Sequence, residues 1–103
     1  MAKLELLARS ELKILEVLWE RGDLPAGQLA NVFKKKTGWN RNTTYTIIKK
    51  CVEKGFIQRT EPNFNCHILI GKEEIRRYAI QTLAELLYGG DRLALLTDLA
   101  KMV

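Results

Sequence analysis

The sequence is poor in the side chains that build catalytic and metal centres. Its 103 residues include one histidine, His67, and two cysteines, Cys51 and Cys66. A single histidine excludes a histidine-rich metal centre and a two-histidine catalytic site, and two cysteines cannot form a disulfide framework. Unpaired thiols are typical of a reducing compartment, so we expect the protein to be cytoplasmic.

Long hydrophobic runs are absent as well. No apolar stretch approaches the length of a membrane span, and residues 1–5 do not begin a signal peptide, so we expect no membrane partner. Seven glycines and two prolines are too few for a loop-dominated or low-complexity chain. With 47% hydrophobic and 28% charged residues, the chain has the composition of one ordinary globular domain with a core.

Recognisable catalytic motifs are missing too. The sequence has no Ser-His-Asp set, no glycine-rich phosphate loop and no acid pair in a plausible pocket. Cys66 and His67 are adjacent in a predicted strand, where neighbouring side chains point to opposite faces, and two ligands do not make a metal site. We therefore expect no enzyme activity, no metal and no cofactor.

The sequence does have a concentration of positive charge. The net charge is +5, yet residues 34–59 hold eight of the 17 basic residues and only one of the 12 acids. The eight are Lys34, Lys35, Lys36, Arg41, Lys49, Lys50, Lys54 and Arg59. Because acids outnumber bases elsewhere, this excess indicates a face that binds a polyanion, with a solvated lysine face as the alternative.

Hydrophobic periodicity and helix-breaking residues predict five helices. Ser10 is the expected N-cap of the first, which Gly22 closes, and Pro25 begins the second, which runs to Lys36. The further elements are helices over about 42–54, over about 72–88 and after the N-cap Asp91, with short strands over 56–59 and 66–70 and a turn at 62–65.

This order of elements predicts a winged helix-turn-helix. The second and third helices form the helix-turn-helix, and the hairpin is the wing that can reach neighbouring phosphates. The predicted fold class is mainly α with a small β-hairpin, with a DNA-binding domain over 1–71 and a helical dimerisation segment over 72–103. Winged helices also serve as protein-interaction modules, so a module without sequence-specific DNA binding is the alternative.

The predicted third helix has two faces of different chemistry. At about 100° per residue, one face collects residues that can pack in a core, namely Thr44, Ile47, Ile48, Cys51 and Val52. The other collects short hydrogen-bonding groups, one aromatic and two lysines, namely Asn42, Thr43, Tyr45, Thr46, Lys49 and Lys50. Glu53 adds the only acid, whereas a face that is merely soluble interleaves acids with lysines.

We therefore expect the second face to bind double-stranded DNA. The candidate base-reading residues are Asn42, Thr43, Tyr45 and Thr46, since such side chains bond base edges in the major groove. The candidates for contact with the DNA backbone are Lys36, Trp39, Arg41, Lys49, Lys50, Arg59 and Asn63. For Trp39 the alternative is packing at the helix-turn-helix, and Lys34–Lys36 also complement the dipole at the end of the second helix.

Several motifs resemble those of the BlaI/MecI/CopY-type penicillinase repressor family, winged-helix transcriptional regulators of bacteria. They are Ser10-Glu11-Leu12 and Val17-Leu18-Trp19 in the first helix, Gly38-Trp39, Thr43-Thr44-Tyr45-Thr46, Lys54-Gly55-Phe56-Ile57 and Gly89-Gly90. In the same order and spacing, they cover about residues 8–100. The resemblance implies a dimeric repressor that binds a palindromic operator through Asn42, Thr43, Tyr45 and Thr46.

The sequence departs from the family pattern in three places. The base-reading arginine of the family falls on Tyr45, so the operator need not be the familiar one. The Asn-Phe pair at which β-lactam-responsive members are cut aligns with Thr97-Asp98, so release by that cleavage is not carried over. The C-terminal cysteine cluster of copper-responsive members is missing, and the chain ends at Val103 before the family's last helix, as a truncated or compact member would.

The two C-terminal helices carry more apolar side chains than the winged-helix core requires. That core is expected to contain Leu12, Leu15, Trp19, Leu29, Phe33, Ile47, Ile48 and Ile57. The apolar residues left over are Leu83, Leu86, Leu87, Leu93, Leu96, Leu99 and Met102. Soluble monomers rarely expose an apolar surface of that size, so we expect these residues to form a homodimer interface.

Overall fold

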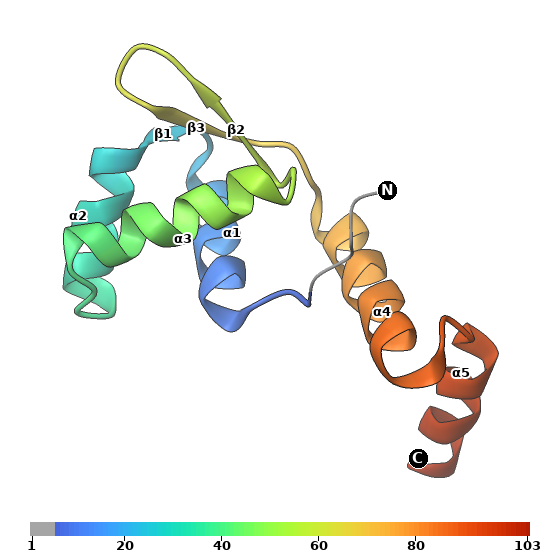
Figure 1. Ribbon diagram of the computed structural model, residues 1–103. Helices are drawn as coiled ribbons and strands as arrows, with labels where there is room; N and C mark the ends of the chain where they lie inside the picture. The colour runs from blue at the N-terminus through green and yellow to red at the C-terminus, as the bar shows by residue number, and fades with distance from the viewer. Residues whose placement is uncertain (1–5) are drawn as a thin grey trace. The chain divides into compact units, whose positions relative to one another are not determined.

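The computed structural model describes residues 6–103. Residues 1–5, which we expect not to begin a signal peptide, lie outside the described residues. The elements are α1 (Arg9–Arg21), β1 (Leu24–Pro25), α2 (Ala26–Lys36), α3 (Arg41–Glu53), β2 (Ile57–Thr60), β3 (Asn65–Ile68), α4 (Lys72–Tyr88) and α5 (Arg92–Lys101) (Figure 1). The chain forms two compact units, one of which spans Ala8–Gly71 while the other contains α4 and α5. The predicted fold class, mainly α with a small β-hairpin, is confirmed.

The first helix begins differently from the sequence prediction. α1 begins at Arg9 after Ala8, and Ser10, the predicted N-cap, lies inside its first turn. The Glu11 carboxylate reaches back and accepts a hydrogen bond from the Ala8 N–H at 2.7 Å, which fixes the start of the helix without a hydroxyl. The prediction of Ser10 as the cap is therefore wrong, whereas Gly22 ends the helix with a φ of 82° as expected.

The other helices begin close to the predicted signals. Pro25 immediately precedes α2, and the Asp91 side chain accepts two backbone N–H groups from the first turn of α5. α3 begins at Arg41, one residue earlier than predicted, because the Asn40 side chain acts as its cap. The Asn40 Oδ1 accepts a hydrogen bond from the Thr43 N–H at 2.8 Å.

The sheet contains one strand that the sequence pattern did not reveal. β1 has only two residues, too few for any alternation, and it pairs antiparallel with β3, so the strand order is β1-β3-β2. β2 and β3 form the predicted hairpin: β2 lies one residue later than expected, while β3 begins one residue earlier and ends two residues earlier. Since α2 follows β1 directly, this pairing brings the hairpin beside the start of α2 (Figure 1).

The core of the first unit lies between its three helices and the sheet. Its largest fully buried side chains include Ile14, Leu15, Leu18, Leu29, Phe33, Ile48, Phe56 and Ile57. α3 buries Thr44, Ile47, Ile48 and Cys51, as its predicted inner face requires, and Val52 is half-buried. Leu12 and Trp19, both predicted in the core, are only half-buried. The Trp19 indole N–H donates to the Ile70 carbonyl at 2.8 Å, and this need for a polar partner holds the ring at the edge of the core.

The second unit is built from α4 and α5. It buries Ile75, Thr82, Ala84 and Leu95, and the Tyr88 hydroxyl donates to Asp98 Oδ2 at 2.8 Å. In the part of the chain that the structure describes, no helix has the length and apolar character needed to cross a membrane.

Candidate nucleic-acid interface

The outer face of α3 is polar and carries almost no acid. Asn42, Thr43, Thr46, Lys49 and Lys50 are all exposed on this helix, as the sequence predicted. The Thr46 hydroxyl donates to the Asn42 carbonyl at 2.9 Å, so its oxygen stays available as an acceptor on this exposed side chain. This part of the face therefore offers amide, hydroxyl and methyl groups that base edges can meet, flanked by two ammonium groups.

Tyr45 is placed differently from its neighbours. It is half-buried, and its hydroxyl accepts a hydrogen bond from Arg41 Nη2 at 3.2 Å. The Arg41 guanidinium also lies over the Tyr45 ring, 5.3 Å from its centroid. Tyr45 therefore has one hydroxyl hydrogen left to donate, and Arg41 keeps most of its N–H groups for another partner.

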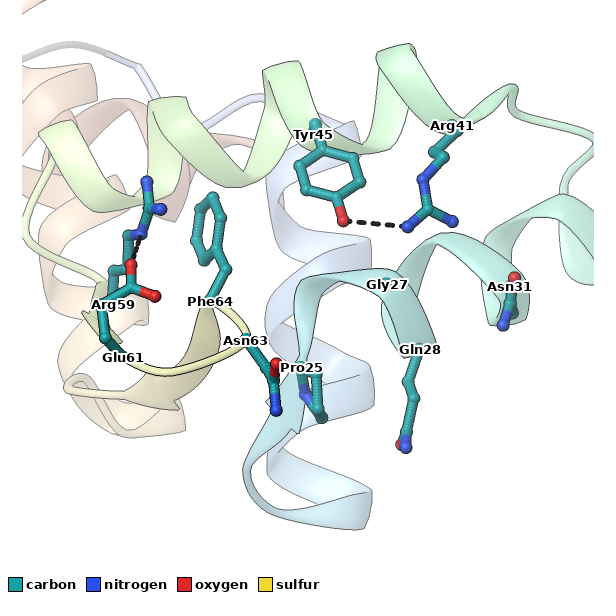
Figure 2. A pocket seen from close by; sticks show the side chains of 10 residues that line it. All are labelled: Pro25, Gly27, Gln28, Asn31, Arg41, Tyr45, Arg59, Glu61, Asn63 and Phe64. Atoms are coloured by element: carbon teal, nitrogen blue, oxygen red, sulfur yellow. Dashed lines mark hydrogen bonds and ion pairs between the residues drawn. The ribbon is translucent and has the colours of Figure 1, made fainter.

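The hairpin turn completes this arrangement. The Phe64 ring meets the Tyr45 ring edge-on, with centroids 5.9 Å apart and an interplanar angle of 72°. On its other side the Arg59 guanidinium lies 4.0 Å from the Phe64 centroid, and Arg59 Nε pairs with Glu61 Oε1 at 2.7 Å. Figure 2 shows Tyr45 standing between Arg41 and Phe64, with Arg59 beyond the phenylalanine. We call these four side chains, Arg41, Tyr45, Phe64 and Arg59, the aromatic–arginine row.

A groove of about 580 Å³ runs beside the aromatic–arginine row. Its lining residues are Pro25, Gly27, Gln28, Asn31, Arg41, Tyr45, Arg59, Glu61, Asn63 and Phe64 (Figure 2). Gly27 leaves room for the ends of the Arg41 and Tyr45 side chains, because a Cβ added there would lie 3.2 Å from Arg41 Nη2 and 3.8 Å from the Tyr45 hydroxyl. The groove thus brings together Arg41, Arg59 and Asn63, three of the predicted backbone contacts.

The sequence reasoning missed several of these groove residues. The sequence pattern does not indicate Gly27 or Gln28 as site residues, and it predicts Phe64 only as part of a turn. A sequence signal for Phe64 did exist, because a bulky aromatic side chain is unusual in a turn otherwise built from Pro62, Asn63 and Asn65.

The remaining predicted backbone contacts lie on two other parts of the surface. Lys36 is exposed at the end of α2, and Lys49 and Lys50 are exposed on α3. Trp39 is half-buried and stacks on Phe33, with ring centroids 4.8 Å apart and planes 16° apart. The packing role that the sequence left open for Trp39 therefore has a specific partner in the core.

Cys66 and His67 point to opposite faces of β3, as their adjacency predicted. Cys66 is buried, whereas His67 is exposed and its Nδ1 lies 2.8 Å from Asp23 Oδ1. Among the described residues, no three His, Cys, Asp or Glu side chains come together as metal ligands. Burial raises the pKa of Cys51 to about 12 and that of Cys66 to about 11, which makes both thiols poor nucleophiles.

The second predicted surface lies on α4 and α5. Leu86, Leu87, Leu93, Leu96, Leu99 and Met102 are 50% to 81% exposed, while Leu83 is half-buried. Leu95, which the prediction left out, is the buried leucine of α5. The apolar side chains that the sequence assigned to an interface are thus mostly in contact with water in the single chain.

Three helices followed by a two-stranded wing, with α2 and α3 joined by a short turn, define the winged helix-turn-helix class. The solution structure of the DNA-binding domain of the repressor BlaI has the same fold, with a TM-score of 0.63 and 18% sequence identity. The similarity covers 72% of this chain and 93% of that domain.

Sequence comparison narrows the class to a family. The family described as penicillinase repressor matches residues 7–102, so the chain belongs to the penicillinase repressor family. An uncharacterised 16.5 kDa protein encoded 3′ of ptsI in Latilactobacillus sakei is 29% identical over 97 residues. That match covers 89% of this chain and 66% of the relative, so the chain spans just under two thirds of the relative's length. The predicted family membership is confirmed.

Proposed function

We propose that this protein is a sequence-specific DNA-binding transcriptional repressor that inserts α3 into the major groove. The observation that carries the proposal is the outer face of α3, where exposed hydrogen-bonding groups and two lysines stand almost without acid. Membership of the penicillinase repressor family and the fold shared with the BlaI DNA-binding domain support it. A repressor acts where bacterial DNA is, which agrees with the expected cytoplasmic location.

In this proposal the side chains of α3 divide between bases and phosphates. Asn42, Thr43 and Thr46 read base edges, since an amide can bond adenine on two atoms and a threonine methyl can meet the thymine methyl. Tyr45 donates its free hydroxyl hydrogen to a base edge, and Arg41 holds the hydroxyl from the other side. The backbone phosphates are contacted by Lys36, Arg41, Lys49, Lys50, Arg59 and Asn63. Trp39 packs on Phe33 and supports the turn between α2 and α3.

We also propose that residues 72–103 form a dimerisation segment and that residues 1–71 form the DNA-binding domain. The exposed leucines of α4 and α5 support the first part, because pairing two copies would remove them from water. A twofold pair places two copies of α3 about one turn of DNA or a multiple apart, which matches a palindromic operator. One α3 alone makes few base contacts, so pairing also supplies the specificity that a repressor needs.

Selection of bound duplexes from a random DNA pool tests this function. We expect an inverted repeat whose half-sites are separated by about one helical turn. Replacement of Leu96 and Leu99 together by aspartate should convert a dimer to a monomer in sedimentation and abolish binding to the selected duplex, with the winged-helix unit still folded by circular dichroism. A control pair, Thr97→Asp with Lys101→Asp, changes exposed polar positions of the same helix. Selection without any enriched sequence, or a wild-type monomer at high micromolar concentration, would contradict the proposal.

A further inference from the structure

We propose that Phe64 is a positioning residue for DNA recognition: its ring holds the Tyr45 side chain in its reading orientation and thereby couples the wing to α3. This inference rests on the proposed function and adds to it a specificity-determining residue in the wing. Phe64 itself touches no base in this account, since its role is to fix the side chain that does.

The contacts of Phe64 link two elements that the chain separates. Its ring packs edge-on against Tyr45 of α3, while its other side is covered by Arg59 of β2. Tyr45 is held on its far side by Arg41, whose Nη2 donates to the Tyr45 hydroxyl. The Tyr45 ring is therefore confined between an arginine of its own helix and an aromatic ring of the wing, as Figure 2 shows.

The backbone of the turn gives a second, independent observation. Asn63 and Phe64 have φ values of 70° and 48°, so both lie in the left-handed region. Asparagine adopts this region readily, whereas a bulky aromatic residue is rarely found there and glycine would fit without strain. The position is also fixed, because the Phe64 carbonyl accepts a hydrogen bond from the Ala26 N–H at 2.9 Å. A phenylalanine held in an unfavourable backbone conformation points to a function of its ring.

Loss of the ring has a specific expected consequence. Without Phe64, the Tyr45 side chain gains rotational freedom toward the space that the ring had filled, so its hydroxyl no longer meets one fixed base position. The charges of α3 and of the wing stay unchanged. Discrimination between sequences should therefore fall, while the electrostatic attraction to any duplex should persist.

The test compares Phe64→Gly, Phe64→Asn and Phe64→Tyr in the full chain. The first two suit the left-handed backbone but lack the ring, and the third keeps the ring. For each variant we would measure the affinity ratio between the selected duplex and a shuffled one, the slope of log affinity against log salt, and thermal unfolding. We expect Phe64→Gly and Phe64→Asn to unfold no earlier than the wild type, to keep its salt slope and to lose about tenfold in the ratio. Phe64→Tyr should keep the ratio.

A double-mutant cycle separates positioning from a direct role. In a Tyr45→Ala background, Phe64→Gly should cause no further loss of the ratio, because the side chain that it positions is absent. A folded Phe64→Gly protein with the wild-type ratio, or an undiminished loss in the Tyr45→Ala background, would overturn this inference alone. A wild-type chain that prefers no sequence would overturn the proposed function, and this inference with it.

Discussion

The carboxylate of Glu11 accepts a hydrogen bond from the ammonium of Lys54 at 2.8 Å, across 43 positions of sequence and nearly out of reach of water. The Glu11 side chain is 1% exposed and that of Lys54 is 11% exposed. The ion pair joins the first turn of α1 to the residue that caps the end of α3, so it ties the proposed reading helix to the body of the domain. The same Glu11 oxygen also accepts a hydrogen bond from the Ala8 N–H, so the ion pair and the start of α1 depend on the same carboxylate.

Removal of one partner of this pair should be strongly destabilising. Lys54→Met leaves the Glu11 carboxylate buried without its counter-charge, and we expect a loss of about 3–5 kcal/mol in the free energy of unfolding, measured with urea. The double variant Glu11→Leu with Lys54→Met should recover part of that loss, since no buried charge remains although the hydrogen bond to the Ala8 N–H is lost. The control Glu53→Gln changes an exposed carboxylate of the same helix and should stay within about 0.5 kcal/mol of wild type. A Lys54→Met protein as stable as this control would show that the pair does not hold α3 in place.

Gly27→Ala should raise stability and weaken DNA binding at the same time. Alanine favours a helix over glycine by up to about 1 kcal/mol, less at this second residue of α2 than in a helix interior, and the atom nearest to the new Cβ is the end of the flexible, exposed Arg41 side chain. That arginine can move away, so the helix gains stability while a phosphate contact is displaced. Chemical unfolding and titration with the selected duplex measure the two effects, and Gln28→Ala on the same turn controls for loss of a groove side chain. Lower stability of Gly27→Ala would mean that the Arg41 side chain cannot move away from the new Cβ, which would contradict this account.

Thr46→Ala and Lys50→Ala should weaken binding in different ways. Loss of Thr46 removes a group that meets a base edge, so we expect a loss of roughly 1–3 kcal/mol for the selected duplex and a relaxed preference at one or two positions. Loss of Lys50, like loss of Lys49, removes a phosphate contact and should weaken all sequences alike, with a salt slope smaller by about one. Fluorescence titrations at several salt concentrations distinguish the two patterns. An unchanged sequence preference in Thr46→Ala and Tyr45→Ala would place the reading face elsewhere.

The buried thiols should make the protein less stable in alkali. Burial raises the pKa of Cys51 from 9.0 to about 12, so above about pH 9 the unfolded chain releases a proton that the folded chain retains. Stability is thus fully present below pH 9 and is lost as pH rises toward 12, by about 1.4 kcal/mol per pH unit for this thiol. Other groups titrate in this range, so the measurement is the difference in unfolding free energy between wild type and Cys51→Ala from pH 8 to 10.5. A difference that does not change with pH would contradict the raised pKa.

The sequence predicted the features that depend on local order. A period of 3.6 residues correctly separated the inner face of α3, with Thr44 and Ile48, from its outer face. Asp91 was correctly predicted as the N-cap of α5. The sequence prediction was wrong or incomplete where a longer-range or less usual contact determines the local structure. The carboxylate of Glu11 replaced the expected cap at Ser10, and β1 forms only because β3 lies beside it.

In the candidate site, too, the sequence predicted the features that depend on one helix and not those that depend on contacts between elements. The exposed residues of α3 follow from the sequence, because each of them projects from one helix. The aromatic–arginine row does not, since it joins Arg41 and Tyr45 of α3 to Phe64 and Arg59, which reach them only after the hairpin has folded back beside α2. No periodic pattern in a single sequence reports such a contact, although the aromatic residue in an otherwise polar turn indicates where it occurs.

The most direct test of the central claim is a titration of the full chain with the selected duplex and with a shuffled duplex of the same composition, across a series of salt concentrations. A sequence-specific repressor should bind the selected duplex at least about a thousandfold more tightly, and both affinities should fall linearly in log salt. Equal affinity for the two duplexes at every salt concentration would show that the basic face attracts DNA without reading it and would contradict the account.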